Sequence, residues 1–138
     1  MTSHLRIQCS RQNLQQVRDF VRSFLLAAHG SEVLVNQVVL AVDEVVANFI
    51  IHANGEDATQ YLDLLMQLRD HNLDVEIEDN GSTLFLPSET APSPDMREYI
   101  RQGRKGGMGM ALVSRIMDKV VFFERNSHTI CHLSKQLE

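Results

Sequence analysis

Cysteine is scarce in this sequence. The 138 residues include only Cys9 and Cys131, which lie far apart, form no CxxC pair and do not belong to a short cysteine-dense chain. Disulfide frameworks and zinc sites normally show one of those patterns. Both residues fall in stretches that alternate like strands. We therefore predict two buried, reduced thiols and neither a disulfide nor a metal site.

Long apolar runs and concentrated basic charge are also missing. We find no run that approaches the about 18 apolar residues of a membrane span, and the amino terminus, MTSHLRIQC, has no apolar signal-peptide core. The formal net charge is -5, and the 13 lysines and arginines are scattered. Scattered basic charge argues against nucleic-acid binding. We expect a cytoplasmic protein, with no membrane contact, whose partners are proteins or small molecules.

Internal repeats and low-complexity tracts are absent as well. The chain is 43% hydrophobic and 22% charged, which is ordinary for a globular domain with one core. We therefore expect one domain over residues 1–138.

The segment Val33 to Ala53, VLVNQVVLAVDEVVANFIIHA, has the clearest periodicity. Its apolar residues recur as one stripe on an α-helix: Val35, Val38, Val39, Val42, Val46, Phe49, Ile50 and Ala53. A polar row follows at i, i+4 and i+8: Glu44, Asn48 and His52. Apolar residues flank this row, so we expect it to be covered, and a covered carboxylate and carboxamide need a cation or ligand as partner. The alternative is an ordinary amphipathic helix whose polar residues align by chance.

The other elements follow from alternation and turn residues. Alternating patterns predict strands over 4–10, 61–69, 73–78, 120–124 and 129–133. A first helix is expected to start after a cap at Ser10 or Asn13 and to end with Gly30 in the left-handed region, Ser31 opens the central helix, and a last helix includes Met110 to Met117. Because hairpins join most strands while the helices are grouped apart, we predict an α+β two-layer sandwich with a mostly antiparallel sheet and helices on one face. An open sheet edge could support a dimer.

Three segments between these elements have the composition of ligand-binding loops. Asp79-Asn80-Gly81 ends a buried strand, where short polar residues often face a ligand. The proline-containing stretch at about 82–105 has no periodicity, and we interpret it as a lid. Arg104-Lys105-Gly106-Gly107-Met108-Gly109 then leads into the last helix. Adjacent glycines admit a ligand close to the backbone, and free N–H groups at a helix start attract phosphate oxygens. The segment matches neither Walker A nor GxGxxG, so a plain loop and cap is the alternative.

A phosphate at the glycine segment would give the polar row a role. Mg²⁺ takes one or two protein oxygens plus nucleotide phosphates, and the Asn48 carboxamide offers one. Glu44 is a candidate base, because a partly desolvated carboxylate with a raised pKa can accept a hydroxyl proton. Asp79 can accept a hydrogen bond from an amino group such as that of adenine, with Gly81 leaving room for the ring. The alternatives are a plain Asx turn for Asp79 and a structural role for His52.

Taken together, these motifs resemble a known family. They are Glu44-x-x-x-Asn48-x-x-x-His52-Ala53-Asn54, Asp79-x-Gly81, Gly106-Gly107-x-Gly109, and a helix that ends in Met117-Asp118-Lys119-Val120. The chain resembles the ATP-binding GHKL (Bergerat) fold of gyrase, histidine kinases and bacterial anti-sigma factor serine kinases, and is most similar to the last. The likeness covers essentially the whole chain.

The resemblance implies an ATP-dependent partner switch. Such a protein holds a sigma factor, or phosphorylates a serine on a STAS-type anti-anti-sigma protein, with ATP and Mg²⁺ as cofactors. It implies Asn48 as the magnesium ligand and Glu44 as the catalytic base. It places the following residues beside the nucleotide: His52, Asp79, Gly81, Arg104, Lys105, Gly106, Gly107, Met108, Gly109 and Thr129. Family members are commonly homodimers, which the resemblance implies here too.

One residue departs from the family pattern. Where the stronger form of the motif has a second glycine, two positions after Gly81, this chain has Thr83. Glu44 favours a serine kinase, because a scaffold that only binds ATP would not need a carboxylate beside the magnesium ligand. Thr83 favours the alternative, a non-catalytic adaptor in which nucleotide only fixes the lid and hence the surface for protein partners.

Overall fold

The computed structural model of the chain describes residues 1–81 and 107–137. The predicted lid at about 82–105 lies outside the described residues. Arg104, Lys105, Gly106 and Thr83 lie outside them too.

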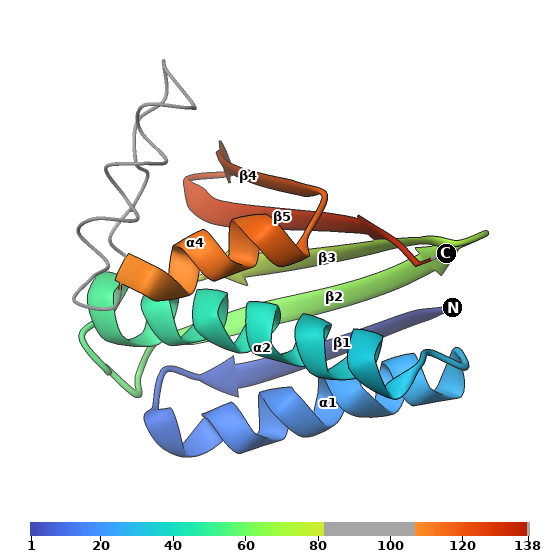
Figure 1. Ribbon diagram of the computed structural model, residues 1–138. Coiled ribbons are helices and arrows are strands. Elements are labelled where there is room, and N and C mark those ends of the chain that lie inside the picture. Colours follow the sequence, from blue (N-terminus) through green and yellow to red (C-terminus); the bar gives the residue numbers. More distant parts are fainter. Residues whose placement is uncertain (82–106, 138) are drawn as a thin grey trace.

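The described residues form two layers, a five-stranded sheet and helices that cover one of its faces (Figure 1). The strands are β1 (Thr2–Gln8), β2 (Tyr61–Arg69), β3 (Asn72–Asp79), β4 (Lys119–Arg125) and β5 (His128–Gln136). Their order is β1-β2-β3-β5-β4, and all four pairings are antiparallel. The helices are α1 (Leu14–Ala27), α2 (Glu32–Asn48) and α4 (Gly107–Ile116). The predicted α+β two-layer sandwich is confirmed.

The core lies between the sheet and α2, which packs between α1 and α4. Alternate residues of β3, namely Leu73, Val75 and Ile77, point to the helices and are fully buried, as the alternation predicts. Val42 and Val45 of α2 meet this surface without exposed area. Burying each such side chain stabilises the fold by roughly 1.5–3 kcal/mol. The sheet thereby fixes which side chains at its strand ends face the helices.

The central helix corrects two predictions. We predicted no run long and apolar enough to cross a membrane, but the helical residues Glu32–Ala53 meet that test by length and composition. Among the described residues, no other helix meets it. About half of that window, 56%, is buried inside the protein, as expected of a core helix. The predicted single α-helix also changes form after Asn48, because Phe49–Ala53 is a π-helix. There the N–H of Asn54 bonds to the carbonyl of Phe49, five residues earlier, at 3.0 Å.

The ends of the first helix differ from the prediction as well. Ser10 caps a short 3₁₀ turn, Arg11–Asn13, that precedes α1, and Asn13 makes no capping bond. At the other end the left-handed residue is His29, with φ of 64°, and not Gly30. The first strand covers Thr2–Gln8, so Cys9 follows it.

Both cysteines are free and buried, as predicted. Burial raises the pKa of the Cys9 thiol to about 11, and the nearby charge of Asp79 adds to the shift. Burial also raises the pKa of Cys131. Both groups are therefore neutral and poorly reactive at physiological pH.

Ser31→Ala should lower the free energy of unfolding by about 1 kcal/mol. The hydroxyl of Ser31 accepts a hydrogen bond from the N–H of Leu34 at 3.2 Å and so satisfies one free donor at the start of α2. Urea unfolding measures the change. The matched control is Ser23→Ala, an exposed position inside α1, where alanine should leave stability unchanged or slightly higher. Equal losses in the two variants would contradict a capping role.

Candidate functional site

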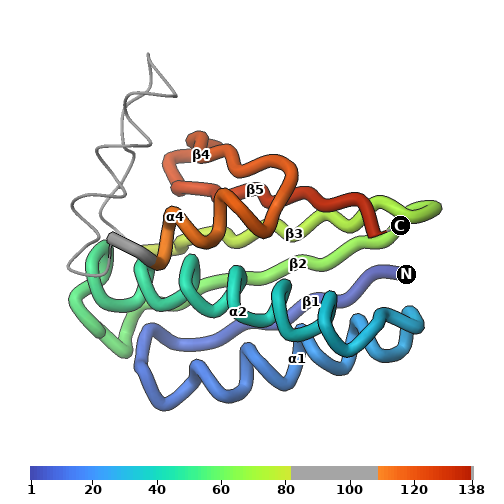
Figure 2. Tube along the Cα trace, viewed as in Figure 1, coloured from blue at the N-terminus to red at the C-terminus, as the bar shows by residue number. Residues whose placement is uncertain are grey.

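Three chain segments that carry predicted site residues converge at one end of the molecule. The carboxyl ends of α2 and β3 and the amino end of α4 lie together there, while the labelled N and C termini lie at the opposite end (Figures 1 and 2). The contacts between α2 and α4 and between Asn54 and Asp79 hold these ends in place. Segments separated by tens of residues in the sequence thus build one region.

Glu44 lies directly against the first turn of α4. A Cβ atom added at Gly109 would overlap Oε1 of Glu44 and lie 2.8 Å from its Cδ, so a larger residue at this position would have to displace the Glu44 carboxylate. The side chain is half-buried, and burial raises the pKa of Glu44, with the neighbouring charge of Asp43 adding to the shift. A carboxylate with a raised pKa is suited to accept a proton near neutral pH.

Asn48 occupies the last position of α2 before the π-helix. Its side chain is buried, at 6% exposure, and its Nδ2 donates a hydrogen bond of 2.7 Å to the main-chain carbonyl of Glu44. This bond uses the nitrogen of the carboxamide and leaves the oxygen as the end that can serve a ligand. Amide oxygens are suitable ligands for a hard cation such as Mg²⁺. π-Helical turns are rare in proteins and often occur at functional sites.

Asp79 is a buried carboxylate with one oxygen unpaired. The residue is 1% exposed. Its Oδ1 accepts hydrogen bonds from the N–H of Gly81 at 2.8 Å and from Nδ2 of Asn54 at 3.1 Å. Its Oδ2 is buried without a hydrogen-bond partner in residues 1–81 and 107–137. Burial raises the pKa of Asp79, against the opposing effects of the bonds from Gly81 and Asn54 and the charge of His128. The Asx turn considered as an alternative does form, yet it leaves Oδ2 without a donor among the described residues.

Gly81 and Thr129 lie beside this carboxylate. A Cβ at Gly81 would overlap Oδ1 of Asn54 and lie 3.0 Å from Oδ1 of Asp79, so a larger residue would have to displace the Asn54 side chain. Thr129 is 1% exposed and pairs with Asp79 across the β3–β5 ladder, which places the two residues side by side on the same face of the sheet. One buried polar cluster is therefore formed by Asp79, Thr129 and the backbone of Gly81.

The other predicted residues divide into two sets. Gly107 begins α4, and Met108 and Gly109 lie in its first turn, whereas we predicted that the glycines precede the helix. Their position still puts the free N–H groups of a helix start beside Glu44. His52 is exposed, although we predicted a covered row, because the π-helix ends the i, i+4 spacing after Asn48.

Asn54 has a role that the sequence patterns did not predict. Its Nδ2 bonds both to the carbonyl of Phe49 at 3.0 Å and to Oδ1 of Asp79 at 3.1 Å. It thereby ties the end of the π-helix to the end of β3. The Asn54-Gly55 pair indicated only a turn, and the contact with Asp79 depends on packing between elements far apart in sequence.

Comparisons with known proteins agree with this fold. Residues 7–135 match the family described as histidine kinase-like ATPase domain. Among solved structures, the crystal structure of the RsbU and RsbW domains of Rv1364c from Mycobacterium tuberculosis superposes with a TM-score of 0.69 at 16% identity. The match covers 99% of this chain and 32% of that longer chain, and it shows a shared fold. None of the curated proteins compared by sequence matches the chain.

Asp79→Asn should raise the free energy of unfolding at pH 7. Because folding raises the pKa of Asp79, the folded protein binds this proton more tightly than the unfolded chain, so stability falls as pH rises from about 3.8 through the folded value. The neutral amide removes that loss, and the difference from wild type should vanish near pH 3. Urea unfolding across this pH range measures it.

Asp63→Asn is the control of opposite sign. A hydrogen bond from Arg6 lowers the pKa of Asp63, which therefore contributes stability above pH of about 3.8 that is lost on acidification. Asp63→Asn should be less stable than wild type at pH 7. If Asp79→Asn were destabilised in the same way, the unpaired oxygen would not carry the cost that we assign to it.

Proposed function

The chain belongs to the histidine kinase-like ATPase domain family, and on that premise we propose that it is an ATP-dependent regulator of the anti-sigma factor type. In this proposal residues 1–138 are one ATP-binding domain, and the protein phosphorylates a serine of a STAS-domain anti-anti-sigma partner. The observation that supports it best is the convergence of a buried, half-paired carboxylate with a glycine-containing helix start at one end of the fold.

The described residues fit the cofactors that the family implies. The buried Oδ2 of Asp79 lacks a donor, and an adenine amino group is such a donor. Gly81 and Thr129 would border the ring, and the N–H groups at Gly107, Met108 and Gly109 would face phosphate oxygens. Asn48 would supply an oxygen to Mg²⁺. Bound ATP supplies the phosphoryl group, and the metal offsets the charge of its oxygens.

Glu44 would act as the base. Its carboxylate lies at the start of α4, beside the place where phosphates would bind, and its pKa is raised by burial. It can therefore take the proton of a serine hydroxyl as that oxygen attacks. His52, exposed at the end of the row, and Arg104, Lys105 and Gly106 complete the proposed nucleotide-binding set on the strength of the family resemblance alone.

The proposed partners rest on the same resemblance. They are the STAS-type protein, a sigma factor held in the alternative state, and a second copy of this chain paired through an open sheet edge. The structural neighbour is a longer protein in which RsbU and RsbW domains occur together, and this chain spans about a third of it, 32%. ATP use and protein partners of this kind also suit the cytoplasm.

A non-catalytic adaptor is the second candidate. Thr83, in place of a motif glycine, favours it. In that case bound nucleotide would determine the conformation of the lid, and the lid would determine which surface a protein partner can bind. Glu44 would then have no catalytic role.

Mg²⁺-ATP should raise the melting temperature of the wild-type protein on the order of 10 °C when nucleotide exceeds Kd about a thousandfold. Asn48→Ala should lose most of the magnesium-dependent part of that shift, because it removes the metal ligand. Differential scanning fluorimetry with and without Mg²⁺ measures both. Asn36→Ala is the matched control, an exposed asparagine of the same helix, and should respond like wild type. A wild-type protein without any shift would remove ATP from the proposal.

Glu44→Gln should reduce phosphorylation of a STAS-domain substrate by at least a hundredfold while leaving the ATP-induced thermal shift in place, because general-base catalysis contributes roughly that factor or more. Transfer of label from ATP to serine measures the rate. Glu32→Gln, in the first turn of α2, is the control and should retain activity. Equal, low labelling by wild type and Glu44→Gln would favour the adaptor.

A further inference from the structure

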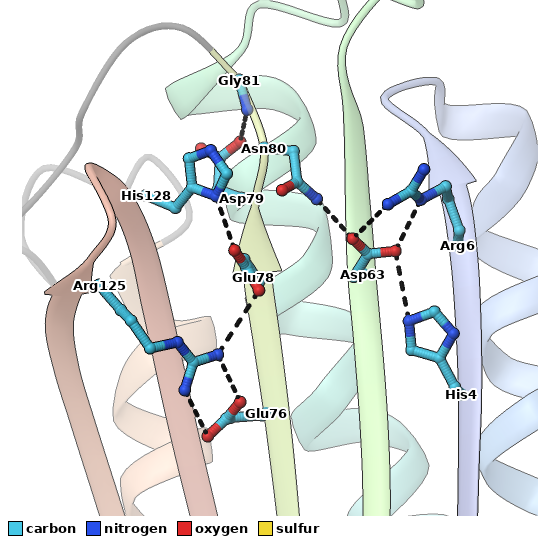
Figure 3. A network of polar contacts seen from close by, with 10 residues as sticks. All are labelled: His4, Arg6, Asp63, Glu76, Glu78, Asp79, Asn80, Gly81, Arg125 and His128. Carbon is cyan, nitrogen blue, oxygen red and sulfur yellow. Dashed lines mark hydrogen bonds and ion pairs between the residues drawn. The ribbon is translucent and has the colours of Figure 1, made fainter.

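The segment Asp79 to Gly81 is held from both faces of the sheet. Asn54 bonds to Asp79 on the helix side, and Asn80 bonds to Asp63 on the open side (Figure 3). Side chains alternate along a strand, so Asp79 faces the helices while Asn80 faces the open side. The N–H of Asn80 bonds to the carbonyl of Tyr61 at 3.0 Å, and its Nδ2 bonds to Oδ2 of Asp63 at 2.7 Å. The hydrogen bonds of Asn80 thus tie it to β2, one position beyond the last β3–β5 pair.

Asp63 is itself fixed by donors from the edge strand. Nε and Nη2 of Arg6 bond to its two oxygens at 2.8 and 3.0 Å, and Nε2 of His4 lies 3.4 Å from Oδ1. The guanidinium group of Arg6 also lies over the ring of Tyr61, 4.1 Å from its centre. The Asp63 side chain is only 16% exposed, and the Arg6 bond lowers its pKa. Asn80 therefore donates to an ionised carboxylate, which makes a stronger bond than a neutral acceptor would.

We propose that Asp63 and Asn80 are positioning residues for base recognition, which act by holding the 79–81 segment. Their bond fixes the backbone at Asn80, so that the N–H of Gly81 stays on Oδ1 of Asp79 and Oδ2 alone is presented to the base. This inference rests on the proposed function, in which Asp79 reads the amino group of adenine.

The consequence of this positioning is selectivity among purines. Adenine presents an amino donor where guanine presents a carbonyl acceptor. A carboxylate oxygen held in one place accepts a hydrogen bond from the amino group of adenine and repels the carbonyl oxygen of guanine. If Asp79 could turn, Oδ1 and Oδ2 would exchange roles and the Gly81 N–H could itself donate to a carbonyl, so discrimination would weaken.

A second paired carboxylate of the same face, Asp74, lies five positions before Asp79 in β3 and provides a comparison. Asp74 bonds to His132 at 2.9 Å and to Asn72, near the other end of β3. Ion pairs that are largely open to solvent contribute little to stability, and this one is partly exposed. Asp63 and Asp74 are thus both carboxylates of the open face paired with histidine, and only Asp63 reaches the 79–81 segment.

Asp63→Ala and Asn80→Ala should each weaken ATP binding about tenfold and reduce the ratio of ATP to GTP affinity severalfold, the effect expected for loss of one well-placed hydrogen bond. Isothermal titration of both nucleotides with Mg²⁺ measures the four constants. The double variant should be little worse than either single variant, because the two residues act through one contact. Asp74→Ala should keep both affinities. Asn80→Ala alone carries the test if Asp63→Ala does not fold.

Amide hydrogen exchange in the nucleotide-free protein gives a readout that does not depend on binding. The Gly81 N–H should exchange at least tenfold faster in Asp63→Ala and Asn80→Ala than in wild type, and at the wild-type rate in Asp74→Ala. Wild-type protein that fails to bind ATP would overturn the proposed function, and Gly81 exchange would still decide the positioning role. Wild-type protein that prefers ATP, with unchanged affinity ratios and Gly81 exchange in both variants, would overturn this inference alone.

Discussion

The buried carboxylate of Asp79 is the constraint on which the arrangement of the site depends. A carboxylate with one oxygen unpaired is unfavourable in a protein interior, and the raised pKa of Asp79 records that penalty. Ile77 of β3 and Phe49 of the π-helix are fully buried at the same end. The fold can therefore hold the group in place without satisfying it. An unpaired oxygen held rigidly is the condition under which a ligand donor gains most from binding.

Glu44 is a second acid whose position is unfavourable for stability but suited to a functional role. It is half-buried beside Asp43, a neighbour of like charge, and it lies so close to Gly109 that a larger residue there would displace its carboxylate. Both acids thus lie where burial raises their pKa, Asp79 at the last position of β3 and Glu44 against the first turn of α4. Structural acids are usually placed to lower their pKa, as Asp63 is by Arg6. The contrast separates the proposed site from the ion pairs of the open face.

Local patterns in the sequence predicted the parts of the site that regular geometry determines. The alternation of Leu73, Val75 and Ile77 puts Asp79 on the core side, and the i, i+4 spacing of Glu44 and Asn48 puts them on one side of α2. The prediction that His52 is covered was wrong because a π-helical turn interrupts the i, i+4 spacing. Residue propensities do not distinguish the sequence FIIHA in a π-helix from the same sequence in a continued α-helix. His29 takes the left-handed position predicted for Gly30 for a similar reason, since caps depend on local geometry that composition does not fix. Contacts such as Asn54 to Asp79 depend on packing between distant elements.

A two-layer sandwich leaves one sheet face without helices, and that face has its own part in the site. Helices on the core side can fix Asp79 through Asn54, but they cannot reach residues that alternate to the other side. Asn80 is such a residue. The register of the β2–β3 hairpin pairs its carboxylate partner Asp63 with Glu78, two positions before Asn80 on the same face, within reach of the Asn80 side chain. That register depends on the hairpin turn, where Asp70 adopts a positive φ of 56°. A local feature at the far end of the hairpin therefore helps to determine how the polar end of β3 is held. Contacts on the open face of the sheet therefore hold the 79–81 segment on one side, while the helices cover Asp79 on the other.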